Sequence, residues 1–198
     1  LKRASCVLWS KVIVAFFPSG VLGVLLDDWM EAHLYHYITV ASALIAYGAD
    51  FILVERSHAN KKRVIETVGK IDSKTALLIG CFQCLSLIPG TSRSGSTILG
   101  AILLGVSRPA AAEFSFFMAI PTMVGASGLK ALKFIKAGTA MTGNETMILL
   151  VGCIVSFLVS LFIIRSLMEY VRKHSFSAFG VYRIVLGIIV LAYFALFS

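Results

Sequence analysis

Long apolar stretches alternate with short charged segments along the whole chain. A helix rises about 1.5 Å per residue, so roughly 20 apolar residues cross a hydrocarbon core about 30 Å thick. Stretches of this kind run approximately over Val7–Leu26, Tyr35–Val54, Pro109–Gly128, Thr146–Leu167 and Ala178–Phe197. The pattern therefore predicts an all-α integral membrane protein with about five transmembrane helices.

One further apolar region is divided by a polar turn. The runs Thr75–Ile88 and Ile98–Val106 flank Pro89–Thr97, a segment of glycines, hydroxyl side chains and one arginine. As helices these runs would be roughly 15–20 Å long, which is too short to cross the hydrocarbon core. We therefore expect a re-entrant helix-loop-helix hairpin over residues 75–106, with its tip at membrane depth. Irregular backbone is tolerated there only where it is buried in protein or lines a water-filled cavity.

The distribution of charge agrees with a hairpin. The net charge is +8, and the cationic residues gather in Lys2–Arg3, Glu55–Lys74 and Arg165–His174, whereas Asp27–Glu31 is acidic. The positive-inside rule places the three basic segments on the cytoplasmic side and the acidic segment outside. This topology requires the hairpin to enter and leave on the same side. It leaves the lysines of Lys130–Lys136 outside, against the rule.

Composition narrows the classes of function. The chain is 58% hydrophobic and 14% charged, with a mean hydropathy of +0.90, and no basic patch with interleaved aromatic residues suggests nucleic-acid binding. Cys81 and Cys84 form a C-x-x-C pair, but on a predicted membrane helix they are better explained as small buried hydrophobes than as a redox pair. His33 and His36 fit a membrane interface better than a metal site, because no further ligand lies near them in the sequence.

The polar turn has the components of an anion site. Glycine-rich backbone offers free N–H groups, hydroxyls add hydrogen bonds, and a helix N-terminus follows. Arg93 adds a planar donor, and an arginine at membrane depth is costly enough to indicate a functional site. The turn therefore predicts a phosphate site within the membrane. The Gly90-to-Thr97 spacing superficially resembles a nucleotide-binding loop, but it lacks the required lysine and preceding strand.

Three side chains outside the turn are candidates for supporting roles. Gln83, two turns before the tip, could hydrogen-bond the tip backbone or simply join helices. Glu113 lies early in a predicted span, where we favour an ion pair with Arg93 or Arg108 over a metal or acid–base role. Arg183, at the start of the last span, is expected to extend to the membrane interface.

The motif Pro-Gly-x-Ser-Arg-Ser-x-x-Thr occupies Pro89–Thr97, after Gly80–Leu85 and before Gly105–Arg108, Glu113–Phe116 and Tyr182–Arg183. This combination resembles the bacitracin-resistance family of undecaprenyl-pyrophosphate phosphatases. The resemblance implies an all-helical fold of two inverted repeats, each with a re-entrant hairpin, in the bacterial inner (plasma) membrane. The chain would then hold the second hairpin, in a pocket open to the outer face.

The resemblance also implies an activity. Family members remove one phosphate from the C55 lipid undecaprenyl diphosphate, which regenerates the monophosphate carrier for peptidoglycan synthesis and confers bacitracin resistance. The catalytic residues that would grip the diphosphate are Arg93, Ser92, Ser94 and Thr97. Further phosphate contacts are expected from Gly90, Thr91, Gly95 and Ser96.

One part of the family pattern is not found. The family's first motif, a pair of glutamates followed by a Ser/Thr-Gly-His segment, has no match in this chain. We therefore expect residues 1–198 to form a single polytopic domain that is N-terminally incomplete and inactive alone. The family implies a divalent cation, Mg²⁺ or Ca²⁺, but its ligands would lie in that first motif, and no metal site is identified here.

Two alternatives to the phosphatase remain at this point. A broken helix with a buried anion site also suits a transporter or flippase for polyprenyl phosphate. A purely structural membrane subunit explains less, because it gives no reason for Arg93 at depth. The expected partners are the polyprenyl diphosphate lipid and the bilayer, with no nucleic acid. The sequence does not decide whether the chain forms a homodimer.

Overall fold

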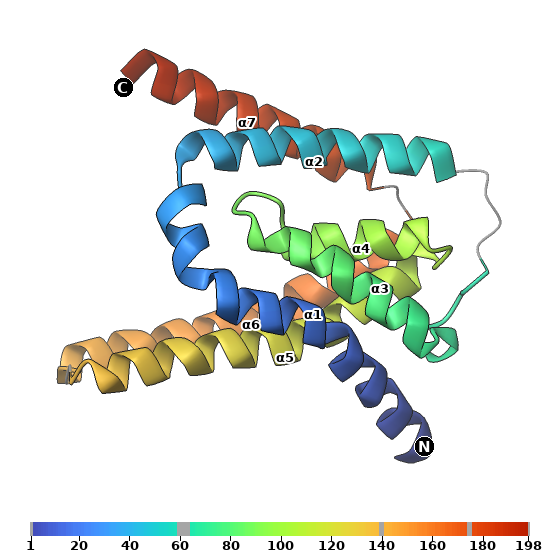
Figure 1. Cartoon of the computed structure of the whole chain (residues 1–198), viewed down its shortest axis with the longest axis horizontal. Helices are drawn as coiled ribbons and strands as arrows, with labels where there is room; N and C mark the ends of the chain where they lie inside the picture. Colours follow the sequence, from blue (N-terminus) through green and yellow to red (C-terminus); the bar gives the residue numbers. More distant parts are fainter. Residues whose placement is uncertain (1, 59–63, 139–140, 174–175, 198) are drawn as a thin grey trace.

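The computed structural model describes residues 2–58, 64–138, 141–173 and 176–197, and Figure 1 shows its arrangement of helices. The α-helices are α1 (Lys2–Leu34), α2 (Tyr37–His58), α3 (Ser73–Cys84), α4 (Arg93–Leu103), α5 (Arg108–Lys136), α6 (Gly143–Lys173) and α7 (Ser177–Phe197). Two short 3₁₀ helices, η1 (Val68–Lys70) and η2 (Leu85–Leu87), lie on either side of α3. Within the described ranges no strand forms beyond one isolated β-bridge.

The five predicted spans are confirmed as helices α1, α2, α5, α6 and α7. Their apolar parts cover Ser5–Leu26, Tyr37–Ser57, Arg108–Lys136, Gly143–Tyr170 and Ser177–Leu196. None of the most apolar window of α6 is buried inside the protein, as expected of side chains that face lipid. The protein is therefore an all-α, multi-pass membrane protein.

Two predicted connections are instead helical. The acidic segment Asp27–Glu31 continues α1 as far as Leu34, and α5 continues to Lys136. Charged residues mark where a span leaves the hydrocarbon core, but their helix propensity is compatible with continuing the helix beyond it. Sequence hydropathy therefore located the spans correctly, but it ended the helices α1 and α5 too early.

The two short apolar runs form the hairpin α3–α4. Asp72 caps α3, accepting hydrogen bonds from the hydroxyl and the backbone N–H of Thr75, and these bonds hold the pKa of the Asp72 carboxyl below its ordinary value. α4 ends in a Schellman motif, in which Gly105 has a φ of 84° and the Val106 N–H donates to the Ala101 carbonyl at 3.0 Å. These two caps explain why α3 begins and α4 ends where they do.

The base of the hairpin is closed by backbone pairing. Ile65 and Val106 form the parallel β-bridge, and the Ser107 N–H donates to the Ile65 carbonyl at 2.8 Å. Ile65 precedes α3 by only a few residues and Val106 follows α4 at once. Both ends of the hairpin therefore lie at the same end of the molecule, as the charge pattern requires.

Other predicted cytoplasmic segments gather at this end. Near the start of α1, Lys11 Nζ donates to the Gly69 carbonyl at 3.2 Å, and Phe176 before α7 lies 6.1 Å from Phe51 between ring centroids.

An exposed ion pair joins Lys133 to Asp28, with 3.6 Å between Nζ and Oδ1. Lys133, on the side that the positive-inside rule disfavours, thus lies against the acidic part of α1.

The hairpin lies between two pairs of long helices. In Figure 1, α3 and α4 lie between α2 and α7 above and α1 and α5 below, and α2 runs beside α7. The Gly48 and Gly180 backbones touch in the α2–α7 pair, and Gly80 of α3 lies directly against the Ala15 backbone of α1. The core follows the hairpin, with buried side chains that include Val12, Phe51, Ile79, Ile98, Ile102, Phe114 and Met118.

The close approach at Gly80 gives a stability prediction. A Cβ at Gly80 would fall on the Ala15 carbonyl, so Gly80→Ala should cost about 1–3 kcal/mol through overpacking. Gly128 in α5 has open space around it, and Gly128→Ala should stabilise its helix by up to about 1 kcal/mol. When both variants are unfolded by heat in the same detergent, the apparent Tm should be lowered by Gly80→Ala only. Equal shifts for both would contradict the packing described.

Candidate functional site

The loop between α3 and α4 contains unusual backbone. Gly90 has a φ of 96°, which glycine adopts freely. Ser92 has a φ of 64° and a ψ of 117°, and in the described part of the chain no other non-glycine residue has a positive φ. Such a conformation costs of order 1–3 kcal/mol and persists where surrounding structure imposes it, often at ligand sites. Ser92 is therefore held in place by its context.

Arg93 begins α4 directly after this strained residue. Its guanidinium is half-buried, and Nη1 is fully buried without a hydrogen-bond partner among the described residues. The backbone N–H groups of Arg93 and Ser94 likewise have no acceptor in the part of the chain described. A cationic group and the positive end of a helix thus share one place without a compensating anion, which is the arrangement that binds phosphate.

The hydroxyl groups of the loop separate into two sets. Ser92 and Ser94 are not buried, and their Oγ atoms lie 3.4 Å apart at the start of α4. The Ser92 Oγ also accepts the Gly95 N–H at 3.3 Å, which caps the helix. These two hydroxyls are therefore available beside Arg93.

The remaining hydroxyls are used within the fold. Thr91, 1% exposed, donates to the Ile88 carbonyl at 2.8 Å, and the Ser96 Oγ donates to the Ser92 carbonyl at 3.3 Å. Thr97 is fully buried, with its Oγ1 2.6 Å from the Ser115 Oγ on α5. Their contacts thus shape the turn from behind. The sequence motif alone did not separate them from the two accessible serines.

Gln83 joins helices and does not contact the tip. Fully buried, it donates through Nε2 to the Ser19 Oγ at 2.5 Å and to the Thr122 Oγ1 at 3.2 Å. Each acceptor follows a proline within a helix, Pro18 in α1 and Pro121 in α5. The expected bond from Gln83 to the tip backbone is wrong, because its helix face is turned toward α1 and α5. The alternative, a link between helices, is confirmed.

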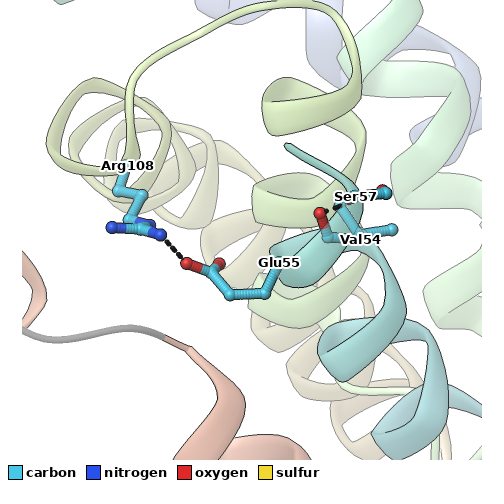
Figure 2. A network of polar contacts seen from close by, with 4 residues as sticks. All are labelled: Val54, Glu55, Ser57 and Arg108. Carbon is cyan, nitrogen blue, oxygen red and sulfur yellow. Dashed lines mark hydrogen bonds and ion pairs between the residues drawn. The ribbon is translucent and has the colours of Figure 1, made fainter. Parts of the chain in front are cut away.

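The expected ion pair of Glu113 is also wrong. Glu113 is exposed on α5, and Arg108 pairs with Glu55 at the end of α2, as Figure 2 shows. Glu55 is 5% exposed, so its carboxylate depends on this partner. Sequence proximity favoured Glu113, whereas the return of the hairpin brings Arg108 beside a residue more than fifty positions away.

Arg183 binds the loop, a contact that its expected place at the membrane interface did not include. It is half-buried, and its Nη2 donates to the Gly90 carbonyl at 2.5 Å. The Tyr47 side chain of α2 is hydrogen-bonded to Ser96. Helices α2 and α7 therefore hold the loop from the side opposite to α5. The sequence predicts no role for Tyr47 and no contact of Arg183 with the loop, because nothing local links either residue to it.

The described residues do not provide a metal site. Among them no group of three or more His, Cys, Asp or Glu side chains lies together. Cys81 and Cys84 are not joined by a disulfide, and the Cys84 thiol donates to the Gly80 carbonyl of its own helix. The described residues thus contain no such cluster for the divalent cation that the family resemblance implied.

The fold and site define a multi-pass membrane protein that presents a cationic, serine-rich loop at the tip of a helical hairpin. The chain belongs to the family described as bacitracin resistance protein BacA, whose sequence pattern matches residues 2–189. Similar curated proteins carry the name undecaprenyl-diphosphatase. They include proteins from Limosilactobacillus fermentum (56% identical over 191 residues), Streptococcus thermophilus strain CNRZ 1066 (54% over 186) and Enterococcus faecalis (52% over 191).

The lengths of these relatives bear on what the chain contains. The alignments cover 96%, 94% and 96% of this chain but 69%, 65% and 68% of the respective relatives. The chain thus spans about two thirds of the length of these relatives.

The strain at Ser92 gives a paired prediction. Ser92→Gly removes the Cβ from a positive-φ position, and glycine is nearly as good a helix cap, whereas Ser92→Ala keeps the strain and loses the cap. We expect the glycine variant to be more stable than the alanine variant by about 1–2 kcal/mol. The apparent Tm of the two proteins in the same detergent measures this. An alanine variant as stable as the glycine variant would show that the backbone at Ser92 is unstrained.

Proposed function

We propose that this chain acts in the dephosphorylation of undecaprenyl diphosphate to undecaprenyl phosphate. It supplies the loop that grips the diphosphate. Membership of the BacA family and the names of its relatives support the reaction. The observation that carries the site is Arg93, a half-buried guanidinium without a partner among the described residues, at the N-terminus of α4.

The chemistry of the reaction fits this loop. Hydrolysis breaks the bond between the terminal phosphorus and the bridging oxygen, and water supplies the new oxygen of inorganic phosphate. Negative charge spreads over the phosphoryl oxygens in the transition state, so catalysis depends largely on positioning and charge stabilisation. A guanidinium such as that of Arg93 can offer two parallel donors to these oxygens. The Ser92 and Ser94 hydroxyls, with their Oγ atoms 3.4 Å apart, add hydrogen-bonding groups at the start of α4.

Roles differ within the motif. We assign direct phosphate contact to Arg93, Ser92 and Ser94, with the free N–H groups at the start of α4. Gly90, Thr91, Gly95, Ser96 and Thr97 shape the loop. Gly95 and Ser96 are packed on α2: a Cβ at Gly95 would lie 3.0 Å from the Phe51 ring, and Ser96 interacts with Tyr47. This division follows burial and hydrogen bonding, since the shaping hydroxyls already have acceptors.

The setting of the reaction follows from the substrate. A C55 polyprenyl chain partitions into a bilayer, and five apolar helices place this protein there. We place it in the bacterial plasma membrane, where the lipid carrier of peptidoglycan synthesis is used. The described residues contain no cluster of three or more potential ligands for the Mg²⁺ or Ca²⁺ expected for the family. Every role assigned here therefore belongs to the chain's own side chains.

The transporter alternative is not supported. The relatives reported above are named as phosphatases, and the family match covers nearly the whole chain. The same anion loop serves either activity, so its geometry favours neither. Release of inorganic phosphate distinguishes the two.

Substitution of Arg93 tests the phosphate contact. In a protein with activity, Arg93→Ala should lower the rate of phosphate release from undecaprenyl diphosphate by about 10³-fold or more. Arg93→Lys should restore only part of it, because an ammonium group cannot replace the bidentate fork. Arg165→Ala, at an exposed position on α6, is the matched control and should leave turnover unchanged. An alanine variant at Arg93 with near-normal turnover would refute the assignment.

A second experiment concerns the extent of the active unit. Phosphate release is compared, with Mg²⁺ or Ca²⁺ present, between this chain and a version extended upstream in its reading frame. Activity in the extended form alone would place the remaining catalytic groups upstream of Leu1, as the absent first motif predicts. Activity of residues 1–198 alone would contradict that prediction and make Glu113 the next residue to substitute. Phosphate release from neither form would count against the phosphatase itself.

A further inference from the structure

Arg183 connects the last helix to the candidate phosphate loop. Its Nη2 donates to the Gly90 carbonyl across 93 positions of sequence, whereas its Nε is buried without a partner among the described residues. No carboxylate of the described chain forms an ion pair with it. A half-buried guanidinium is costly in an apolar protein, so a backbone carbonyl as its observed acceptor needs an explanation.

The acceptor lies at a point where the loop has little freedom. At Gly90 a Cβ would lie 2.5 Å from the Val40 carbonyl oxygen of α2, so the loop backbone is pressed against that helix. Helix α7 packs on α2 through backbone contact between Gly180 and Gly48. Arg183 is therefore fixed to the same surface that touches Gly90, and its bond determines which way the Gly90 peptide faces.

The direction of this peptide matters for an anion. A carbonyl oxygen turned toward a phosphate would repel it, whereas N–H groups attract it. Because the peptide is planar and trans, binding the Gly90 oxygen to Arg183 turns the Thr91 N–H the opposite way, and it donates to the Ile88 carbonyl at 3.2 Å. At the other end of the loop, the Tyr47 side chain of α2 is hydrogen-bonded to Ser96. The two ends of the loop are thus held from the α2–α7 pair.

We propose that Arg183 is a positioning residue that fixes the phosphate loop through the Gly90 carbonyl. It turns that carbonyl away from the anion and holds Ser92, Arg93 and Ser94 in the geometry that binds the transferring phosphoryl group. Its effect on turnover rests on the function proposed above, whereas its effect on the loop does not.

Hydrogen exchange tests the effect on the loop without any activity. Arg183→Met removes the donor, while Arg183→Lys and Arg183→Gln keep one; Arg165→Met on α6 is the matched control. A lost hydrogen bond to a charged donor corresponds to roughly a tenfold or greater change in local opening. We expect about that increase in exchange at Thr91 and Ser96 in the methionine variant. Exchange near Val68 and in the Arg165→Met control should stay at the wild-type rate.

Kinetics then separate positioning from direct contact with the substrate. If Arg183 acts through the loop, the methionine variant should lose mainly kcat, about tenfold or more, with KM within about threefold. Lys and Gln, which can still donate to the Gly90 carbonyl, should each rescue part of this loss. Wild-type exchange in the methionine variant would overturn the proposal. So would a loss confined to KM in which Gln is as poor as Met, since the charge itself would then contact the phosphate.

The two readouts fail independently. Should no variant, the wild type included, release phosphate in any form, the proposed function would fall while the exchange data still decided the role of Arg183. If Arg183→Met did not fold, the comparison of Arg183→Lys and Arg183→Gln with Arg165→Met would replace it. Faster loop exchange in the glutamine than in the lysine variant would then support positioning by a charged donor. If Arg183→Lys and Arg183→Gln both showed wild-type hydrogen exchange in the loop while their turnover was impaired, the positioning role of Arg183 would be overturned.

Discussion

The structure depends on one constraint: a loop of irregular backbone that carries a guanidinium must be held among apolar helices. Lipid supplies no hydrogen bonds, so every polar group of the loop must be bound by protein, ligand or water. Thr91 and Thr97 are bound by backbone and Ser115, and Gly90 is bound by Arg183. The Arg93 guanidinium and the first N–H groups of α4 have no partner in the part of the chain that the structure describes. The loop thus keeps a cationic group and helix N–H groups unpaired at the start of α4, as an anion site requires.

The same constraint explains the order of the surrounding helices. Two pairs of long helices enclose α3 and α4, and close contacts at glycines such as Gly80 let the backbones approach without side chains between them. Gln83 fastens α3 to the proline-bearing parts of α1 and α5, and the Glu55–Arg108 ion pair holds the base of the hairpin to α2. The long helices therefore serve chiefly to hold the short helices α3 and α4 in place.

Local features of the sequence predicted much of this arrangement. Hydropathy located the five spans, and the length of the runs beside Pro89–Thr97 identified the hairpin, because both signals lie in contiguous residues. The partners of Gln83, Arg108 and Arg183 could not be predicted in this way. Each contact joins positions 39 or more apart, and only the return of the hairpin and the packing of α7 on α2 bring them together. The division of the hydroxyls into accessible and buried sets also required the backbone of Ser92.

The most direct test is protection of the loop by the lipid. In a protein with its native cysteines replaced, Ser94→Cys places a thiol at the exposed start of α4. Its rate of labelling by a water-soluble maleimide is measured with undecaprenyl diphosphate and, separately, with undecaprenol. We expect the diphosphate to slow labelling in a saturable way and the alcohol to leave the labelling rate unchanged. Equal labelling in both, or equal slowing by both, would mean that the loop does not bind the diphosphate.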